Sequence, residues 1–103
     1  MEKIGQLKDF LSKDPEDSFL KHALALEYIK LGDDQAARTL FEQILYQNPG
    51  YVGSYYHLAK LLERTGEGSL AIEWYEKGMK MARAANDDHT YNELQAAYED
   101  LAY

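Results

Sequence analysis

Residues 24–41 read LALEYIKLGDDQAARTLF, and residues 58–75 repeat the same pattern as LAKLLERTGEGSLAIEWY. The shared positions lie 34 residues apart and begin, in the first copy, with Leu24, Ala25, Gly32, Ala37 and Phe41. A fixed period of this length is typical of solenoids, in which each repeat is a supersecondary unit that buries its apolar face against its neighbours. The pattern therefore predicts an all-α repeat protein.

Apolar residues spaced by three and four along the whole chain predict six helices. We expect them at residues 2–12, 16–31, 33–46, 52–64, 69–84 and 88–102. Gly32 and Gly66 would close the corners, because glycine readily adopts the left-handed conformation that ends a helix. Asp14 followed by Pro15 is expected to start the second helix, and Asp33 or Asp34 the third.

Small residues mark the expected contact points between paired helices. Ala25, Ala37, Ala59 and Ala71 recur once per helix, and antiparallel helices approach closely where side chains are small. Gly78, in mid-helix, has the same interpretation. The last helix carries Gln95 where the others have alanine, so we expect the array to end there.

The repeats organise the chain as one domain, residues 1–103. Its expected parts are an N-terminal capping helix at 1–14, a first repeat at 15–49, a second repeat at 50–86 and a C-terminal capping helix at 87–103.

Composition excludes several functions. Eleven Lys and Arg stand against eighteen Asp and Glu, for a net charge of −7, without a basic cluster, which argues against nucleic-acid binding. The absence of cysteine removes disulfides and thiolate metal sites. No apolar run is long enough to span a bilayer, and the first residues lack a signal-peptide core, so we expect a cytoplasmic protein without membrane insertion.

The repeated residues resemble the tetratricopeptide repeat (TPR), a 34-residue helical hairpin with a Leu-Gly-x2-Tyr, Ala-x3-Phe and Pro pattern. The first repeat departs from the pattern at Lys21, where an aromatic residue is usual, and the second at Arg83, which replaces proline. The resemblance implies a right-handed superhelix of about six antiparallel helices. It also implies a non-enzymatic adaptor that binds a peptide or protein on its concave face, without a cofactor.

The usual concave-face positions of the family map onto two of the helices. They are His22, Leu26, Ile29 and Lys30 in the first repeat, and Tyr56, Lys60, Glu63 and Arg64 in the second. Asn92, Ala96 and Glu99 would follow from the last helix. Some relatives hold a peptide carboxylate with Lys and Asn where this chain has His22 and Leu26, so the resemblance does not extend to that clamp.

Each of these interpretations has an alternative. Lys30, Lys60 and Arg64 either meet acidic groups of a partner or are ordinary solvated positions. Of nine tyrosines, five lie on expected core stripes, namely Tyr28, Tyr55, Tyr75, Tyr91 and Tyr98. Tyr56 is the one we favour for partner contact.

Catalytic and metal sites are not indicated. The three histidines, His22, His57 and His89, fall on different helices without metal-ligand spacing. The acidic pairs Asp33-Asp34 and Asp87-Asp88 stand at helix starts, where carboxylates favour capping over acid–base chemistry. The main rival to an adaptor is a structural subunit that assembles with itself, including a homodimer through Tyr98, Leu101 and Tyr103 of the C-terminal helix.

Overall fold

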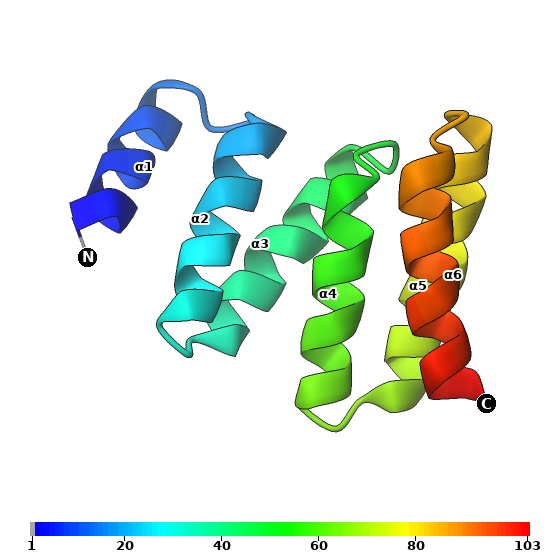
Figure 1. The fold of residues 1–103 in the computed structure, drawn as a ribbon. Coiled ribbons are helices and arrows are strands. Elements are labelled where there is room, and N and C mark those ends of the chain that lie inside the picture. Colours follow the sequence, from blue (N-terminus) through cyan, green and yellow to red (C-terminus); the bar gives the residue numbers. More distant parts are fainter. Residues whose placement is uncertain (1) are drawn as a thin grey trace. The chain divides into compact units, whose positions relative to one another are not determined.

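The computed structural model describes residues 2–103, and these form six α-helices (Figure 1). The helices are α1 (Glu2–Lys13), α2 (Ser18–Lys30), α3 (Asp34–Gln47), α4 (Gly53–Arg64), α5 (Gly68–Ala84) and α6 (Asp88–Ala102). No strand occurs among these described residues. The predicted all-α class is therefore confirmed, with each helix within about two residues of its expected bounds.

The helices belong to two compact units, one ending at Asn48 and the other covering Pro49–Tyr103. In the first unit, α2 packs against both α1 and α3. In the second unit, α5 packs against both α4 and α6, and α4 also touches α6. Successive helices within a unit are joined by short turns and run antiparallel (Figure 1).

Three helices end in the same way. Gly32 (φ 81°), Gly66 (φ 85°) and Asn86 (φ 57°) adopt the left-handed conformation just after α2, α4 and α5. In each case the next backbone N–H donates to a carbonyl in the last turn, with N···O distances of 2.8–2.9 Å. This is the Schellman pattern, which satisfies carbonyls that the helix itself leaves unpaired. The two predicted glycine corners are confirmed.

Aspartate side chains cap the starts of three helices. The carboxylates of Asp17, Asp33 and Asp87 accept from backbone N–H groups three residues later, at 3.0–3.1 Å. The expectation that Asp14 and Pro15 begin the second helix was wrong, because Asp17 supplies the cap and α2 starts only at Ser18. Residues 14–17 instead form the connection from α1.

Small residues occupy the tightest places in the core. Ala25, Ala37, Ala59 and Ala71 have no exposed surface. A Cβ atom at Gly78 would lie 2.7 Å from the Tyr55 Cβ and 2.9 Å from a Leu94 methyl, far inside normal contact. The prediction that a neighbouring helix presses on Gly78 is confirmed, and it does so from both α4 and α6.

The buried face of α2 differs from the predicted one. Phe19 and Leu31 fit the apolar spacing of this helix, yet they are 66% and 54% exposed, whereas Lys21 is only 7% exposed. The Lys21 ammonium donates to the Gln47 side-chain oxygen of α3 at 2.9 Å. Apolar residues lie on nearly every side of α2, so apolar spacing alone selected the wrong residues for burial.

Candidate protein-binding surface

The four candidate residues of the first unit lie on the side of α2 that faces away from buried Leu24. His22, Leu26 and Ile29 are partly exposed, and Lys30 is exposed. They form one stripe because residues three, four and seven apart share a face of a helix. The Phe41 ring of α3 packs edge-on against His22, with ring centres 5.6 Å apart. This contact fixes one edge of the stripe against the hairpin core.

Lys30 is paired at the C-terminal end of this stripe. Its ammonium lies 3.1 Å from Glu27 Oε2, and the Lys3 ammonium of α1 lies 3.6 Å from the same oxygen. The hydrogen bond from Lys30, followed by the charge of Lys3, lowers the pKa of the Glu27 carboxyl against the opposing effect of burial. One ionised carboxylate therefore holds two exposed ammonium groups, which leaves a local excess of positive charge.

The four candidate residues of the second unit lie on α4 and also include a lysine whose ammonium lies near a carboxylate of the same helix. The Lys60 ammonium lies 5.8 Å above the centre of the Tyr56 ring and 3.7 Å from Glu63 Oε2. Tyr56 also packs edge-on against His57. A cation held over an aromatic face and beside a carboxylate is positioned before a ligand arrives. Arg64, exposed at the end of the helix, adds a second cation.

Glu63 is held from inside the hairpin. The Tyr75 hydroxyl of α5, whose residue is fully buried, donates a short hydrogen bond to Glu63 Oε2. Burial, and then this hydrogen bond, raise the pKa of Tyr75, so its hydroxyl remains a donor. Glu63 therefore contacts both a buried residue of the hairpin and an ammonium group on the surface.

Helix α6 continues the same side of the second unit. Asn92, Ala96 and Glu99 are all exposed. Between α4 and α6, burial lowers the pKa of His57, and the Glu93 carboxylate only partly opposes that effect. This part of the surface therefore carries a neutral imidazole at neutral pH.

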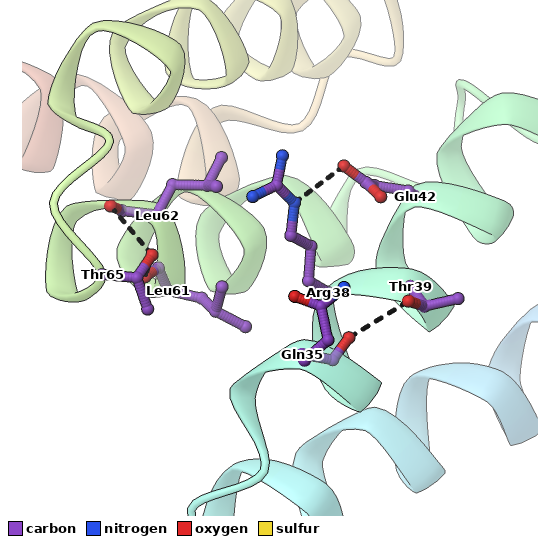
Figure 2. Close-up of polar contacts among 7 residues, drawn as sticks. All are labelled: Gln35, Arg38, Thr39, Glu42, Leu61, Leu62 and Thr65. Carbon is purple, nitrogen blue, oxygen red and sulfur yellow. Dashed lines mark hydrogen bonds and ion pairs between the residues drawn. The ribbon is translucent and has the colours of Figure 1, made fainter.

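A hollow lies along α3. Its volume is about 310 Å³, and its lining consists of Thr39, Glu42, Gln43, Tyr46 and Gln47. Arg38 pairs with Glu42 at 3.0 Å, and Thr39 donates to the Gln35 backbone oxygen (Figure 2). Tyr46 is 88% exposed. The other four lining residues have polar side chains, although the surface of the hollow is mostly apolar.

Thr65, the residue after Arg64, caps the C-terminal end of α4. Its hydroxyl donates to the Leu61 backbone oxygen at 3.0 Å and, more weakly, toward Leu62 at 3.4 Å (Figure 2). This contact satisfies carbonyls of the last turn, so the backbone that carries Arg64 is well held.

Residues 2–103 carry no sign of a metal centre or of a membrane-spanning helix. No group of three or more His, Asp or Glu side chains is arranged to hold a metal ion. In the same described range, no helix is both long and apolar enough to cross a bilayer.

Sequence reasoning missed several features of this surface. Phe19 lies three and seven residues before His22 and Leu26, so helical spacing places it on their stripe, where it is exposed. The Lys3 contact to Glu27 and the Tyr75 contact to Glu63 join residues on different helices. Helical spacing carries no signal for such contacts.

Comparisons with known proteins agree with this architecture. The tetratricopeptide repeat family model matches residues 20–51 and 52–84. A tetratricopeptide repeat domain protein from Salinibacter ruber is 40% identical, with a TM-score of 0.81, over 84% of this chain and 88% of that one. The structure of the complex of the TPR2B domain of yeast Sti1 with pHsp70 is 17% identical, with a TM-score of 0.89, and matches 96% of this chain and 79% of that one.

A longer relative matches only in part. Mouse aspartyl/asparaginyl beta-hydroxylase is 27% identical over 74 residues, which are 72% of this chain but only 10% of that protein. The match therefore concerns a short segment of the hydroxylase. With two matched repeats that cover most of its length, the chain belongs to the tetratricopeptide repeat family, whose repeats generally mediate protein–protein interaction.

Proposed function

We propose that this chain is a non-enzymatic interaction module that binds a peptide or protein segment on the concave face carried by α2 and α4. The proposed contacts are His22, Leu26, Ile29, Lys30, Tyr56, Lys60, Glu63 and Arg64. Membership of a family of generally non-enzymatic scaffolds supports the class of function.

The main support for the proposal is that the Lys60 side chain on α4 is already ordered by its neighbours. Lys60 is held between the Tyr56 ring and the Glu63 carboxylate, and Glu63 is itself held by buried Tyr75. Side chains that are already ordered lose less conformational entropy on binding. The same end of α2 carries Lys30, which stands 34 residues before Arg64. Carboxylates near apolar side chains of a partner would complement the cations on each of these helices.

The test is capture of partners from source-cell lysate, followed by titration of each captured protein in purified form. The variant Tyr56→Ala, Lys60→Glu, Arg64→Glu should lose the partner. A matched control is Tyr46→Ala, Lys77→Glu, Lys80→Glu, which removes one aromatic ring and reverses two charges elsewhere. It should keep the partner. Equal binding by both variants, with helical content unchanged in circular dichroism, would overturn the proposed site.

A second candidate is self-assembly through the C-terminal helix. Tyr103 is 94% exposed and its ring packs edge-on against Tyr98, with ring centres 6.3 Å apart. Leu101 is partly exposed beside them. Light scattering over a range of concentrations tests this candidate. A dimer that dissociates in Tyr98→Ser, Tyr103→Ser would favour it, and a strictly monomeric protein would remove it.

A further inference from the structure

Lys21 is a buried ammonium group with unused hydrogen-bonding capacity. The residue is only 7% exposed, and the side-chain oxygen of Gln47 accepts one of its three N–H donors at 2.9 Å. Among the described residues of this unit, Lys21 has no second acceptor and takes part in no ion pair. Buried charges are ordinarily paired, because they lose their hydration on burial. Lys21 therefore still has charge and donors to offer a ligand.

The second repeat shows that the fold does not require a charged residue at this place. In the 34-residue register, Lys21 corresponds to Tyr55, which is 3% exposed. The Tyr55 hydroxyl donates to the Pro49 backbone oxygen at 2.6 Å, so its polar group is satisfied within the chain. Gln47 corresponds to Met81, which is also uncharged. A buried charge costs stability that these residues do not, and such departures are expected at functional positions.

The side-chain amide of Gln47 joins Lys21 to the hollow along α3. Because an ammonium has only donors, the amide oxygen of Gln47 is the atom that meets Lys21, and both N–H groups of the amide nitrogen remain for other acceptors. Gln47 is exposed and lines the hollow. A donor bound to the amide oxygen polarises the amide and strengthens its N–H groups as donors. An acceptor in the hollow would thus bind Gln47 directly, with the charge of Lys21 behind it.

The hollow suits a side chain with an apolar stem. Its volume of about 310 Å³ is at the lower end of the range of ligand pockets. Its surface is mostly apolar, although four of its five lining side chains are polar. Long polar side chains cover such a surface with their methylene groups. Glutamate has methylene groups followed by a carboxylate, which matches an apolar hollow with donors at one end.

The carboxylate that lines the hollow is already paired. Arg38 Nε lies 3.0 Å from Glu42 Oε2, one turn along α3 (Figure 2). Five residues of helix separate Glu42 from Gln47, which is about 7 Å along the axis. The Gln47 end of the hollow is therefore the end where an incoming carboxylate meets least repulsion.

Other negative groups near Lys21 are engaged or only partly charged. Asp17, one turn earlier on α2, uses its carboxylate to cap the helix through the Leu20 N–H. Asp14 and Glu16 are exposed on the connection before it, where water and salt screen their charges. The C-terminal carbonyls of α3 carry about half a negative charge, against the full charge of Lys21.

We propose that Gln47, with Lys21 behind it, is a binding site for a glutamate side chain of a partner protein, whose apolar stem lies in the hollow along α3. The site belongs to the first unit alone. It is separate from the concave-face contacts proposed above, so either site can fail without the other.

The probe is a tripeptide with glutamate between two leucines, acetylated and amidated so that the glutamate is its only charge. Its twin has glutamine in place of glutamate. Titration of the full chain at low salt, followed by NMR, should shift the side-chain amide signals of Gln47. The acidic tripeptide should bind at least about threefold more tightly than its twin, because a carboxylate is the stronger acceptor. Acetate, as a third ligand, tests whether a free carboxylate is sufficient.

Lys21→Met removes the charge but keeps a side chain of similar length, and it should abolish the preference for glutamate over glutamine. Gln47→Glu provides Lys21 with a carboxylate of the chain itself and should abolish binding of the acidic tripeptide. Lys80→Met is the matched control, because Lys80 is exposed on α5, and it should keep the preference. Circular dichroism should show an intact fold in all three variants.

Several results would overturn the proposal. They are equal affinity for the two tripeptides, an unchanged preference in Lys21→Met, and full binding by Gln47→Glu. Acetate that binds as tightly as the acidic tripeptide would exclude a protein side chain as the specific ligand. Loss of tripeptide binding in the Tyr56, Lys60 and Arg64 variant, with Lys21→Met unaffected, would assign the tripeptide to the concave face instead.

Discussion

Gly78 lies so close to Tyr55 that a Cβ atom on the glycine would stand 2.7 Å from the tyrosine Cβ. The absent side chain lets α5 approach both α4 and α6. Gly78→Ala should therefore destabilise the protein, with overpacking of about 1–3 kcal/mol outweighing a gain of about 1 kcal/mol in helix propensity. The measurement is the free energy of unfolding in urea. Gly5→Ala is the matched control, because a Cβ there meets no atom within 4 Å, and it should stabilise α1.

Lys21 is a buried ammonium whose partner is a neutral amide, Gln47, at 2.9 Å. Lys21→Met should raise the free energy of unfolding by about 1 kcal/mol, because an apolar side chain of similar length has no charge to desolvate. Gln47 is exposed and can hydrogen-bond to water instead. Gln47→Ala should act in the opposite direction and destabilise by about 1–2 kcal/mol, because the ammonium then loses that acceptor. If both substitutions changed the free energy of unfolding in the same direction, this explanation would be wrong.

Asn86 occupies one of three left-handed helix ends, and the other two are glycines, Gly32 and Gly66. Its φ of 57° is strained for a residue with a Cβ atom, although asparagine tolerates it better than most. Asn86→Gly should stabilise the protein by about 0.5 kcal/mol, and Gly66→Ala should destabilise it by about 1 kcal/mol. Thermal unfolding of the two variants beside the parent tests both signs. A loss of stability in Asn86→Gly would mean that the asparagine side chain has another role.

The pH dependence of stability should contain a contribution from His57. Burial lowers its pKa below the ordinary value of 6.5, so the unfolded chain binds a proton more readily than the folded one. This contribution is fully present above about pH 6.5 and is lost as the pH falls from there toward the lower folded pKa. Urea titrations at a series of pH values should show the loss in the parent and not in His57→Gln.

The exposed His89 provides the control for that series, since His89→Gln should keep the loss of stability. A separate loss at lower pH should come from Asp87, whose pKa is lowered first by the hydrogen bond from the Thr90 backbone. That contribution is present above the ordinary carboxyl range and disappears as the pH falls through the lowered pKa. Asp87→Asn should reduce this loss of stability at low pH. It should not change the pH range over which the His57 contribution is lost.

Local signals predicted most of the fold. Helix positions followed from apolar spacing, and the Gly32 and Gly66 corners followed from glycine's access to positive φ. The failures arose where two local signals competed. Asp14-Pro15 was predicted to start α2, but Asp17 competes with it as a cap and supplies the cap in the structure.

The candidate surface was less predictable. The 34-residue register predicted the concave-face positions, but some of the side chains that contact them come from other helices. Glu63 depends on Tyr75 twelve residues away, and Lys21 depends on Gln47 twenty-six residues away. Exposure of Phe10 was also invisible to spacing, because a stripe has the same sequence whether or not a neighbouring helix covers it.

The bond between Lys21 and Gln47 has a consequence for the order of events during synthesis. Both residues precede Pro49 and lie in the first compact unit, so their bond needs no residue of 49–103. The first three helices can therefore close around Lys21 while the rest of the chain is still being made. A nascent chain would then expose Phe10, on α1, before the second unit has formed.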